Sequence, residues 1–498
     1  MPGAVAAVLS AASAVGTFLG FAGAAATIVG AIVVVGTVAL ATKAIKKKQQ
    51  QQRAQQTSIS GVLVTKAGTS APIPLVYGQR RIAGTRIFVD SEGDKNKYLH
   101  VIETLCEGPI EGCTELYFAD KKIAESSDNG ANWSITDSDY NNKIDIKFFD
   151  GSQTSRISTN VNGVSSNGLN RAVHSNWPSG AVGNKVAYIY LVCEFDQDLF
   201  GGGLPAVTYT VKGKKLPAIG SDHDTTLTYS QEPARIIYDY LINPTYGKNI
   251  PFGLVDATTF NAAATYNSQS VQKTADASEG NETRFLCNAY IDTSTPLIEN
   301  LEELLTTCRA GLITGDTYKL IQDKPTTALS ITINDDNIVG SIQFIQANKA
   351  TLLNHIRAKF PNEDTTFNFQ EDITVVENTT LSDPSGSVDK LKLSRDIELQ
   401  HTTSKTMCNR ILTEEINQSR QSGVIEVKVD PSMIDLAVGD VVKFTNSTLG
   451  QTDKLYRIIK TIVSPEHTIT LNMREYDNNV YWDNSKTVIT SNKDDTDH

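Results

Sequence analysis

The stretch "STPLIENLEELLTTCRAG", residues 294–311, predicts the clearest helix in this chain. Ser294 or Thr295 can cap its start, and Pro296 fits the first turn, where a backbone N–H has no helical partner. Gly311 fits the position just beyond a helix end. One apolar stripe follows from the 3.6-residue period and comprises Leu297, Ile298, Leu301, Leu304, Leu305 and Cys308. We therefore expect a helix with one face packed on a core.

Only two other segments have a comparable helical pattern. "EPARIIYDYLIN" (232–243) places a proline near its start, and "SKTMCNRILTEEINQSR" (404–420) has an inward stripe of Met407, Cys408, Ile411, Leu412 and Ile416. Most of the remaining chain is strand-like. The predicted strands include residues 57–89, 98–111, 113–123, 185–195 and 206–216, the last with alternating exposure, and a group of four or five short strands after residue 422.

These patterns predict a β-rich α+β chain of several domains, with small β-barrels or sandwiches and few helices. At roughly 100–200 residues per domain, 498 residues allow three or four domains. The boundaries we predict are 1–56 (apolar helical segment and polar linker), 57–215 (β-rich), 216–400 (α+β), 401–482 (helix and small barrel) and 483–498 (polar tail).

The N-terminal segment is unusual for an otherwise polar chain. Residues 4–42 contain no charged side chain, and a run this long is a candidate for a membrane-spanning helix. A basic cluster, Lys43–Lys48, and a glutamine-rich linker to residue 56 follow it. Small residues that would let helices approach closely are Gly16, Gly20, Gly23, Gly30 and Gly36. Three interpretations stay open: a membrane anchor, a segment enclosed within an assembly, and a helix buried in the protein's own core.

The charge and the cysteines exclude several classes of protein. The net charge of −11 and the pI near 5.2 argue against a general nucleic-acid-binding surface, although a channel through which DNA passes would suit an acidic wall. The six cysteines are scattered and show no metal-binding spacing, so we expect reduced, buried thiols.

No sequence motif points to catalysis, a cofactor or a metal. Gly201–Gly203 lacks the Lys-Ser/Thr of a phosphate loop, and Asp222-His223-Asp224 is expected to be a solvated loop. Glu302-Glu303 and Glu414-Glu415 are expected on solvated helix faces. We therefore predict no catalytic, cofactor-binding or metal-binding residues.

Three collinear stretches resemble the central tail-tip hub proteins of long-tailed bacteriophages, the tip attachment protein J family typified by phage lambda. They are "LHVIETLCEGPIEG" (99–112), "PARIIYDYLINPTYGKNIPFGLVDATTFNAAATYN" (233–267) and "TRFLCNAYIDTSTPLIENLEELLTTCRAGLITGDTYKLIQDKP" (283–325). The motif positions are Glu107, Gly108, Pro109, Gly112, Asn243, Pro244, Tyr246 and Gly247. The resemblance covers roughly residues 70–480, and its motifs are structural.

This resemblance implies a homotrimer at the distal end of the virion tail, whose domains continue the tail tube and close it. The partners it implies are the distal tail protein ring, the tape-measure protein, and tail fibres or receptor-binding proteins; DNA would pass without sequence-specific binding. The family's long C-terminal fibre modules are missing, which suggests that another protein binds the receptor. The family also lacks the apolar leader, which could plug the lumen or enter the host membrane.

Two alternatives from other classes remain. One is a bacterial envelope protein anchored by residues 4–42, with a β-rich binding body. The other is a cell-wall hydrolase at a tail tip, because a pair of catalytic carboxylates leaves no fixed spacing in a sequence.

Overall fold

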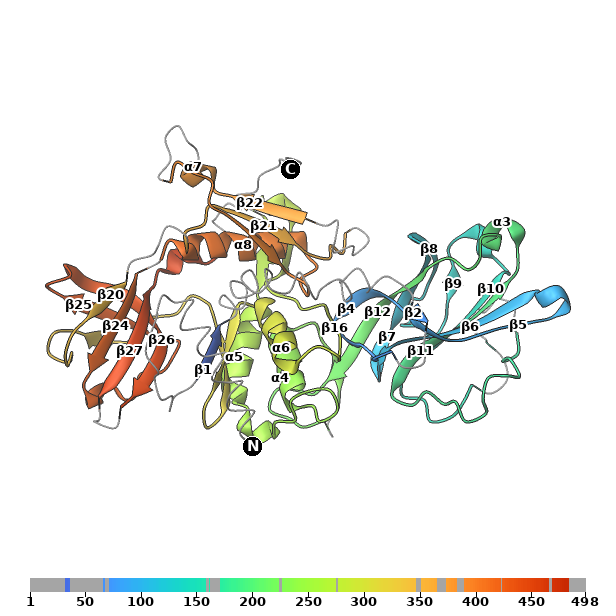
Figure 1. Cartoon of the computed structure of the whole chain (residues 1–498), viewed down its shortest axis with the longest axis horizontal. Coiled ribbons are helices and arrows are strands. Elements are labelled where there is room, and N and C mark those ends of the chain that lie inside the picture. Colours follow the sequence, from blue (N-terminus) through green and yellow to red (C-terminus); the bar gives the residue numbers. More distant parts are fainter. Residues whose placement is uncertain are drawn as a thin grey trace.

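The computed structural model describes residues 32–35, 66–67 and 71–482, apart from 158–160, 162–170, 224–225, 275, 346–350, 365–372, 383–388, 422 and 465–467. The described chain is β-rich with few helices and forms three bodies in a row (Figure 1). A β-rich body lies at one end, a body containing most of the helices lies in the middle, and the C-terminal sheet lies at the other end.

Two sheets pack face to face in the first body. One has the order β10-β11-β6-β5-β2, from Ile144–Phe149, Val186–Glu194, Tyr98–Glu107, Thr85–Glu92 and Lys66–Ala67. The other has the order β13-β12-β7-β8-β9, from Thr228–Tyr229, Val207–Leu216, Ile110–Phe118, Lys121–Glu125 and Ser134–Ile135, and β4 (Gln79–Ala83) also pairs with β12. Their inward side chains, among them Val101, Leu116 and Ile189, make one continuous core. The short helix α3 (Gln197–Phe200) lies between β11 and β12.

The strand β12 is buried along most of its length, where we predicted alternating exposure. The strands β7 and β4 pair with its two edges and β3 (Leu75–Tyr77) packs against it, so that only Lys212 and Lys215 of β12 are partly exposed. Its C-terminal end enters the central body, where β3 pairs with β16 (Ala289–Ile291). The first two bodies are therefore joined by paired and packed strands.

Three helices and a hairpin form the central body. Helices α4 (Pro233–Ile242), α5 (Ala257–Asn267) and α6 (Leu297–Thr306) pack with the hairpin of β17 (Ala310–Thr314) and β18 (Tyr318–Gln322). A smaller hairpin pairs β14 (Ser270–Gln272) with β15 (Asn281–Thr283). The same core continues into α8 (Lys405–Ser419) and a three-stranded sheet in the order β22-β21-β23, from Ile373–Glu377, His355–Lys359 and Ser394–Glu398, with α7 (Thr379–Ser382) after β22.

The C-terminal body is a six-stranded sheet in the order β19-β25-β26-β27-β24-β20. Its strands are Thr332–Ile333, Val441–Asn446, Gln451–Val463, Ile469–Glu475, Val424–Val429 and Gln343–Ile345. Two of them, β19 and β20, precede α8 in the chain. The end strands do not pair with each other, and none of the sheets in the described residues closes on itself. The prediction of a β-rich chain with few helices is confirmed. We predicted small barrels or sandwiches, and among the described residues no closed barrel forms, because the end strands of this sheet do not pair.

The predicted helices at 232–243 and 404–420 are confirmed as α4 and α8, and the five inward residues of α8 are buried. The helix predicted at 294–311 is shorter. It begins at Leu297 after Pro296, with no side-chain cap, and ends at Thr306. Arg309 takes the left-handed conformation (φ 52°), so Gly311 does not end the helix and instead lies in β17. Leu297 and Ile298 are exposed, whereas the rest of the predicted stripe is buried.

Most of the N-terminal segment lies outside the described residues, including Gly16, Gly20, Gly23, Gly30 and Gly36, the linker up to residue 56 and the tail 483–498. Four of its residues, β1 (Ile32–Val35), form a strand antiparallel to β17, where we predicted helix. All four are β-branched, which favours a strand on a free sheet edge. Within the described residues, none of the helices has the length and hydrophobicity that crossing a bilayer requires.

The prediction of reduced, buried thiols is confirmed. All six cysteines are free and buried. Burial raises the pKa of the Cys106 thiol to about 12 and also raises that of the Cys113 thiol, so these thiols stay neutral.

Candidate functional site

The first motif, Glu107 to Gly112, forms the turn between β6 and β7. Gly108 N–H donates to the Lys185 carbonyl (2.8 Å), and Ile110 N–H donates to the Asp150 carbonyl (2.9 Å). A Cβ at Gly108 would lie 2.7 Å from the Asp150 oxygen, and one at Gly112 would lie 2.3 Å from Asn129. The two glycines therefore let neighbouring backbones approach more closely than any side chain would allow. The Gly108–Pro109 peptide bond within this turn is cis.

The second motif, Asn243 to Gly247, ends α4 and turns the chain back. Asn243 N–H donates to the Asp239 carbonyl, and its Oδ1 accepts from the backbone N–H groups of Thr245 (2.9 Å) and Tyr246 (3.4 Å). Such an asparagine replaces the hydrogen bonds that the helix loses at its end. Gly247 then passes so close to α4 that a Cβ there would lie 2.3 Å from the Tyr240 carbonyl oxygen.

The two motifs meet at Lys214 of β12. Its buried ammonium donates to the Gly108 carbonyl, lies 3.9 Å from the Glu107 carboxylate, and sits 5.1 Å from the centroid of the Tyr246 ring. Burial lowers the pKa of Lys214 and raises that of Glu107, and each charge partly offsets the effect on the other. Residues more than a hundred positions apart are thus joined through one lysine.

A buried carboxylate, Asp239 of α4, lies beside this contact. Its Oδ2 accepts from the phenols of Tyr77 (2.6 Å) and Tyr246 (2.8 Å), and its Oδ1 lies 3.0 Å from His223 Nε2. Burial, followed by the charge of Asp239, raises the pKa of both tyrosines, so they remain donors. We call Lys214, Glu107, Tyr77, Tyr246, Asp239 and His223 the motif junction.

His223 corrects one of our predictions. We expected Asp222-His223-Asp224 to be a solvated loop; Asp222 is exposed and residue 224 lies outside the described part, but the His223 ring is held against α4. The Asn243 amide also lies 3.0 Å from His223 Nε2. The hydrogen bond to Asp239 raises the pKa of His223, and burial opposes this less strongly.

A second buried network joins the central body to the C-terminal sheet. Asp323, just after β18, lies 2.9 Å from the Arg309 guanidinium and 2.6 Å from that of Arg457 on β26. The Tyr481 phenol donates to it at 2.6 Å, and Gln418 of α8 donates at 3.0 Å. Burial alone would raise the pKa of Asp323, but Arg309 and Arg457 outweigh it and hold that pKa far below its usual value.

Glu414 and Glu415 belong to this network, so our prediction of a solvated face for them is wrong. Both are buried and lie 3.1 Å and 3.5 Å from the Arg309 guanidinium, and Glu414 also accepts from Trp482 N–H at 2.8 Å. Burial raises the pKa of Glu414, and Arg309 limits the increase. We call Arg309, Asp323, Glu414, Glu415, Gln418, Arg457 and Tyr481 the ionic junction.

The carboxylates of the ionic junction all have partners, and the described residues also offer no metal site. Each carboxylate is held by an arginine or a hydrogen-bond donor, so these acids act as fixed structural charges. In the part of the chain that the structure describes, no group of three or more His, Cys, Asp or Glu side chains is arranged to hold a metal ion.

No protein-family model matches the chain. Two curated proteins are similar to it in sequence. Baseplate hub protein pb3 of Escherichia phage T5 is 21% identical over 476 residues, which cover 85% of this chain and 49% of the relative. Tip attachment protein J of Escherichia phage SECphi27 is 23% identical over 202 residues, which cover 37% of this chain and 16% of that protein. This chain therefore spans about half the length of the first relative and a sixth of the second.

These similarities support a phage tail-tip hub protein located at the distal end of the phage tail. One solved structure, a chain from the virion of a native gene transfer agent particle, shares the fold with a TM-score of 0.54 and 14% identity, covering 96% of this chain and 98% of that one.

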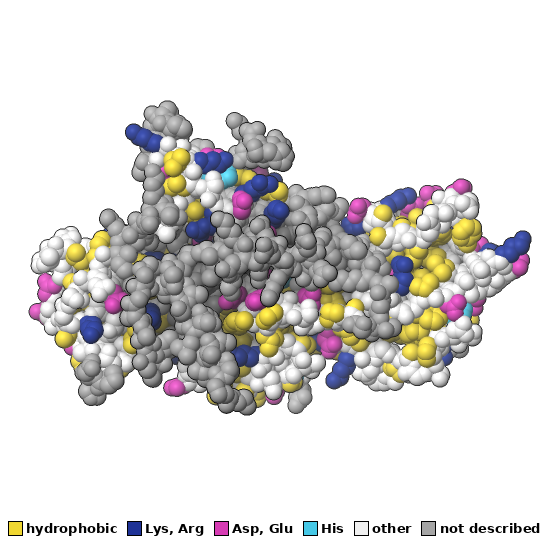
Figure 2. All heavy atoms as spheres, in the orientation of Figure 1, with side chains coloured by type: hydrophobic (Ala, Val, Ile, Leu, Met, Phe, Trp, Pro, Cys, Tyr) yellow, Lys and Arg dark blue, Asp and Glu magenta, His cyan; other side chains and the backbone are white. Residues whose placement is uncertain are grey.

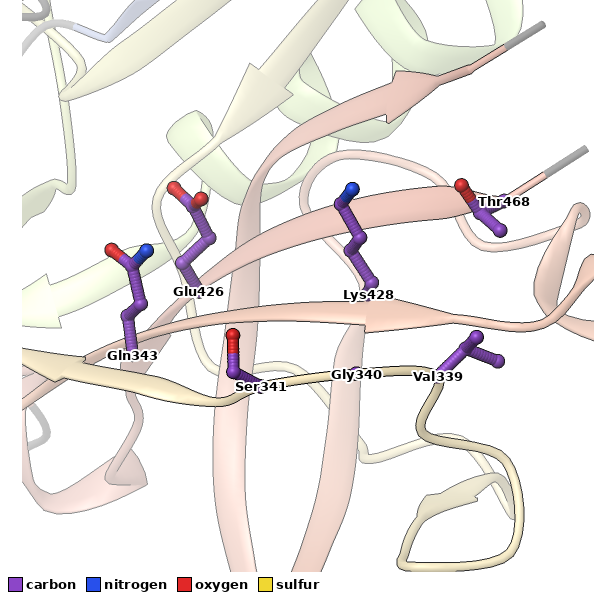
Figure 3. Close-up of a pocket in the computed structure, with 7 residues that line it drawn as sticks. All are labelled: Val339, Gly340, Ser341, Gln343, Glu426, Lys428 and Thr468. Carbon is purple, nitrogen blue, oxygen red and sulfur yellow. The ribbon is translucent and has the colours of Figure 1, made fainter. Parts of the chain in front are cut away.

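A small cavity lies among the described residues, on the solvent face of the C-terminal sheet. Its volume is about 350 Å³. It lies beside β24, along residues 339–342, which come just before β20, the strand that pairs with β24. Figure 3 shows Ser341, Gln343, Glu426 and Lys428 projecting to the same side of this sheet. The lining contains one acidic side chain (Glu426), one basic side chain (Lys428) and several polar groups, with neither a cysteine nor a histidine. We assign no chemistry to this cavity.

Sequence reasoning located the motifs of this hub but missed Lys214, Asp239, Arg309 and Asp323. Two of them are charged residues beside apolar ones: Asp239 interrupts "IIYDYLI", and Arg309 separates the stripe of α6 from β17, whereas Lys214 and Asp323 stand in polar sequence and gave no such signal. A charge at a position that the helical period assigns to the buried face was the available signal, since buried charges need partners.

Proposed function

We propose that this chain is the central structural hub of a phage tail tip, where three copies form a cap that continues the tail tube and closes its channel. The cap would attach the other tip proteins or fibres and would open for release of the tape-measure protein and DNA. The observation that carries this proposal is the similarity to a baseplate hub protein along 85% of the chain.

The internal construction of the chain supports such a role. The motif junction and the ionic junction tie the three bodies together through buried, directional contacts. We infer that these buried ion pairs fix the geometry of the chain more than they add stability. A subunit that must hold one orientation in a closed ring needs such fixed angles between its bodies, because small errors would prevent closure.

The partners we propose are the distal tail protein ring, the tape-measure protein, tail fibres or receptor-binding proteins, and the host envelope. DNA would pass without sequence-specific binding, which the net charge of −11 favours because it repels a polyanion. Residues 4–42 would plug the lumen or insert into the host membrane, with close packing at Gly16, Gly20, Gly23, Gly30 and Gly36. We infer a structural rather than an enzymatic role, in line with the names of both relatives.

The deciding experiment is a reconstruction of the tail end of the phage particle without imposed symmetry. Three copies of the chain around the tail axis, below the tube, are expected. A chain that is absent from purified particles but present in host membranes would refute the hub role and support the anchored envelope protein instead. Three copies with an open channel in resting particles would refute only the closing function.

A further inference from the structure

The central body exposes four large apolar side chains that belong to two different elements. Phe252 and Leu254, in the short 3-10 helix Phe252–Leu254 before α5, are 43% and 45% exposed, and Leu297 and Ile298, at the start of α6, are 41% and 51% exposed. Figure 2 shows hydrophobic side chains at the surface over this body. We call these four residues the apolar patch. Exposed apolar residues gathered in one region mark a contact site more often than isolated ones do.

Both halves of the apolar patch lie at the C-terminal end of α4. Ile250 N–H donates to the Leu241 carbonyl (3.0 Å), which places the chain leading into Phe252 at that end. The Asn300 side chain donates to the Tyr240 phenol (3.1 Å), which places the start of α6 there as well. The Phe252–Leu254 part of the apolar patch therefore lies near the Asn243–Gly247 turn, and the α6 part lies near the Tyr240 phenol.

The apolar leader approaches the same region. Ile32, the first residue of β1, pairs with Thr314 of β17, Thr314 pairs with Tyr318 of β18, and Tyr318 forms a bridge with Val255. Three strand spacings of roughly 4.8 Å separate Ile32 from Val255, or about 14 Å. Residues 4–31 therefore join the described chain at Ile32, beside Thr314 at the end of β17, and Lys248 contacts Tyr318 of the same hairpin.

We propose that residues 4–31 of the same chain dock on the apolar patch in the free protein. At about 3.3 Å per extended residue, five residues would cover the 14 Å, so most of this segment remains to lie on the patch. The segment contains no charged side chain, so covering four exposed apolar side chains removes apolar surface of both partners from water. The docked state would keep the leader from binding lipid before the tail is triggered.

This proposal rests on the proposed function. It assigns a binding site in the free protein to the segment that would later plug the lumen or enter the membrane. It can fail separately, because docking is tested on the purified chain and the hub role on phage particles.

Cross-linking within the full-length chain tests the contact. The double variant Ala25→Cys, Phe252→Cys is treated with a short bis-maleimide; the six native thiols are buried and will not compete. We expect a cross-link at the mass of one chain, at least five times more abundant than in the matched variant Ala25→Cys, Val463→Cys, whose second site is equally exposed but lies on the C-terminal sheet. Equal yields in the two variants, no cross-link, or a cross-link only between two chains would overturn the proposal.

Vesicle binding gives an independent readout. In the variant Phe252→Ser, Leu254→Ser we expect flotation with phosphatidylcholine vesicles to rise several-fold over the unchanged chain, because the leader is released. Val463→Ser is the control and should leave binding unchanged. Binding that falls would show that the patch itself meets lipid, and binding that stays constant would show that the patch does not hold the leader; both results contradict the proposal. Circular dichroism verifies that each variant is folded.

Discussion

Asp323 and Arg309 form a buried ion pair of 2.9 Å that couples the central hairpin to two other parts of the molecule. The second oxygen of Asp323 binds Arg457 of the C-terminal sheet, and the rest of the Arg309 guanidinium faces Glu414 and Glu415 of α8. One carboxylate thus lies between two arginines from different bodies. A change of orientation between these bodies would have to separate charges that have no access to water.

The first prediction concerns this carboxylate. Asp323→Asn preserves its shape but removes its charge, leaving Arg309 and Arg457 without their shared partner. We expect the free energy of unfolding to fall by about 3–5 kcal/mol, the usual effect of breaking a buried pair on one side. Urea denaturation followed by tryptophan fluorescence measures it. Asp94→Asn, at the exposed tip between β5 and β6, is the control and should change stability by less than about 0.5 kcal/mol; a similar small effect in both variants would contradict the prediction.

The second prediction concerns pH. Because Asp239 raises the pKa of His223, the folded chain binds this proton more tightly than the unfolded chain, whose histidines titrate near ~6.5. The stabilisation is fully present below that pH and is lost as the pH rises through the raised pKa. The stability difference between the unchanged chain and His223→Gln should therefore be larger at acidic than at basic pH, in paired urea denaturations at each pH. Asp222→Asn, which removes a weaker contact of His223, should produce a smaller change, and parallel pH profiles of the unchanged chain and His223→Gln would refute the assignment.

The sequence predicted the local structure best where one pattern dominated. The apolar stripe of residues 404–420 and the short strand patterns after residue 422 indicated their elements correctly, since burial on one face determines the period. The end of α6 could not be predicted, because Gly311 offered the ordinary helix stop while Arg309 adopted the strained conformation. The Arg309 side chain pairs there with Asp323 and Glu414, contacts that the helical pattern of residues 294–311 does not reveal.

The junctions show the same limit. The family resemblance gave Asn243, Pro244 and Gly247 as motif positions, but the partner of the turn that they form is Lys214, which the sequence places on an ordinary strand. Likewise, Glu414 and Glu415 have the composition of a solvated helix face, and only the packing of Trp482 and Arg309 against α8 buries them. Long-range partners of this kind leave no periodic signal in a single sequence.

The third prediction tests whether Lys214 holds the two motifs together. Lys214→Met fills similar space but leaves the buried Gly108 carbonyl without its donor and Glu107 without its nearest cation. A loss of about 1–3 kcal/mol is expected from the orphaned carbonyl. The adjacent Lys215→Met is a matched control, because Lys215 makes a partly exposed ion pair with Glu111 at 3.4 Å, worth at most about 1 kcal/mol. Equal losses from the two substitutions would show that Lys214 has no special role.

The last prediction concerns the turn after α4. In Gly247→Ala the new methyl group would lie 2.3 Å from the Tyr240 carbonyl oxygen and 2.8 Å from that of Asn243, so the turn must move away from α4. We expect a loss of about 1–3 kcal/mol, as for other overpacked sites. The displaced turn would also withdraw the Tyr246 phenol from Asp239, so hydrogen exchange at the end of α4 should accelerate.

Gly202→Ala is the control for this substitution, because a methyl group there has no atom within 4 Å. It should leave both stability and exchange unchanged. If Gly247→Ala lowers stability but leaves hydrogen exchange at α4 unaltered, Gly247 does not support the motif junction. Tyr246 would then keep its contact with Asp239 without help from the turn. Faster exchange confined to residues 238–250 would instead tie the family motif directly to the packing of the central body against β12.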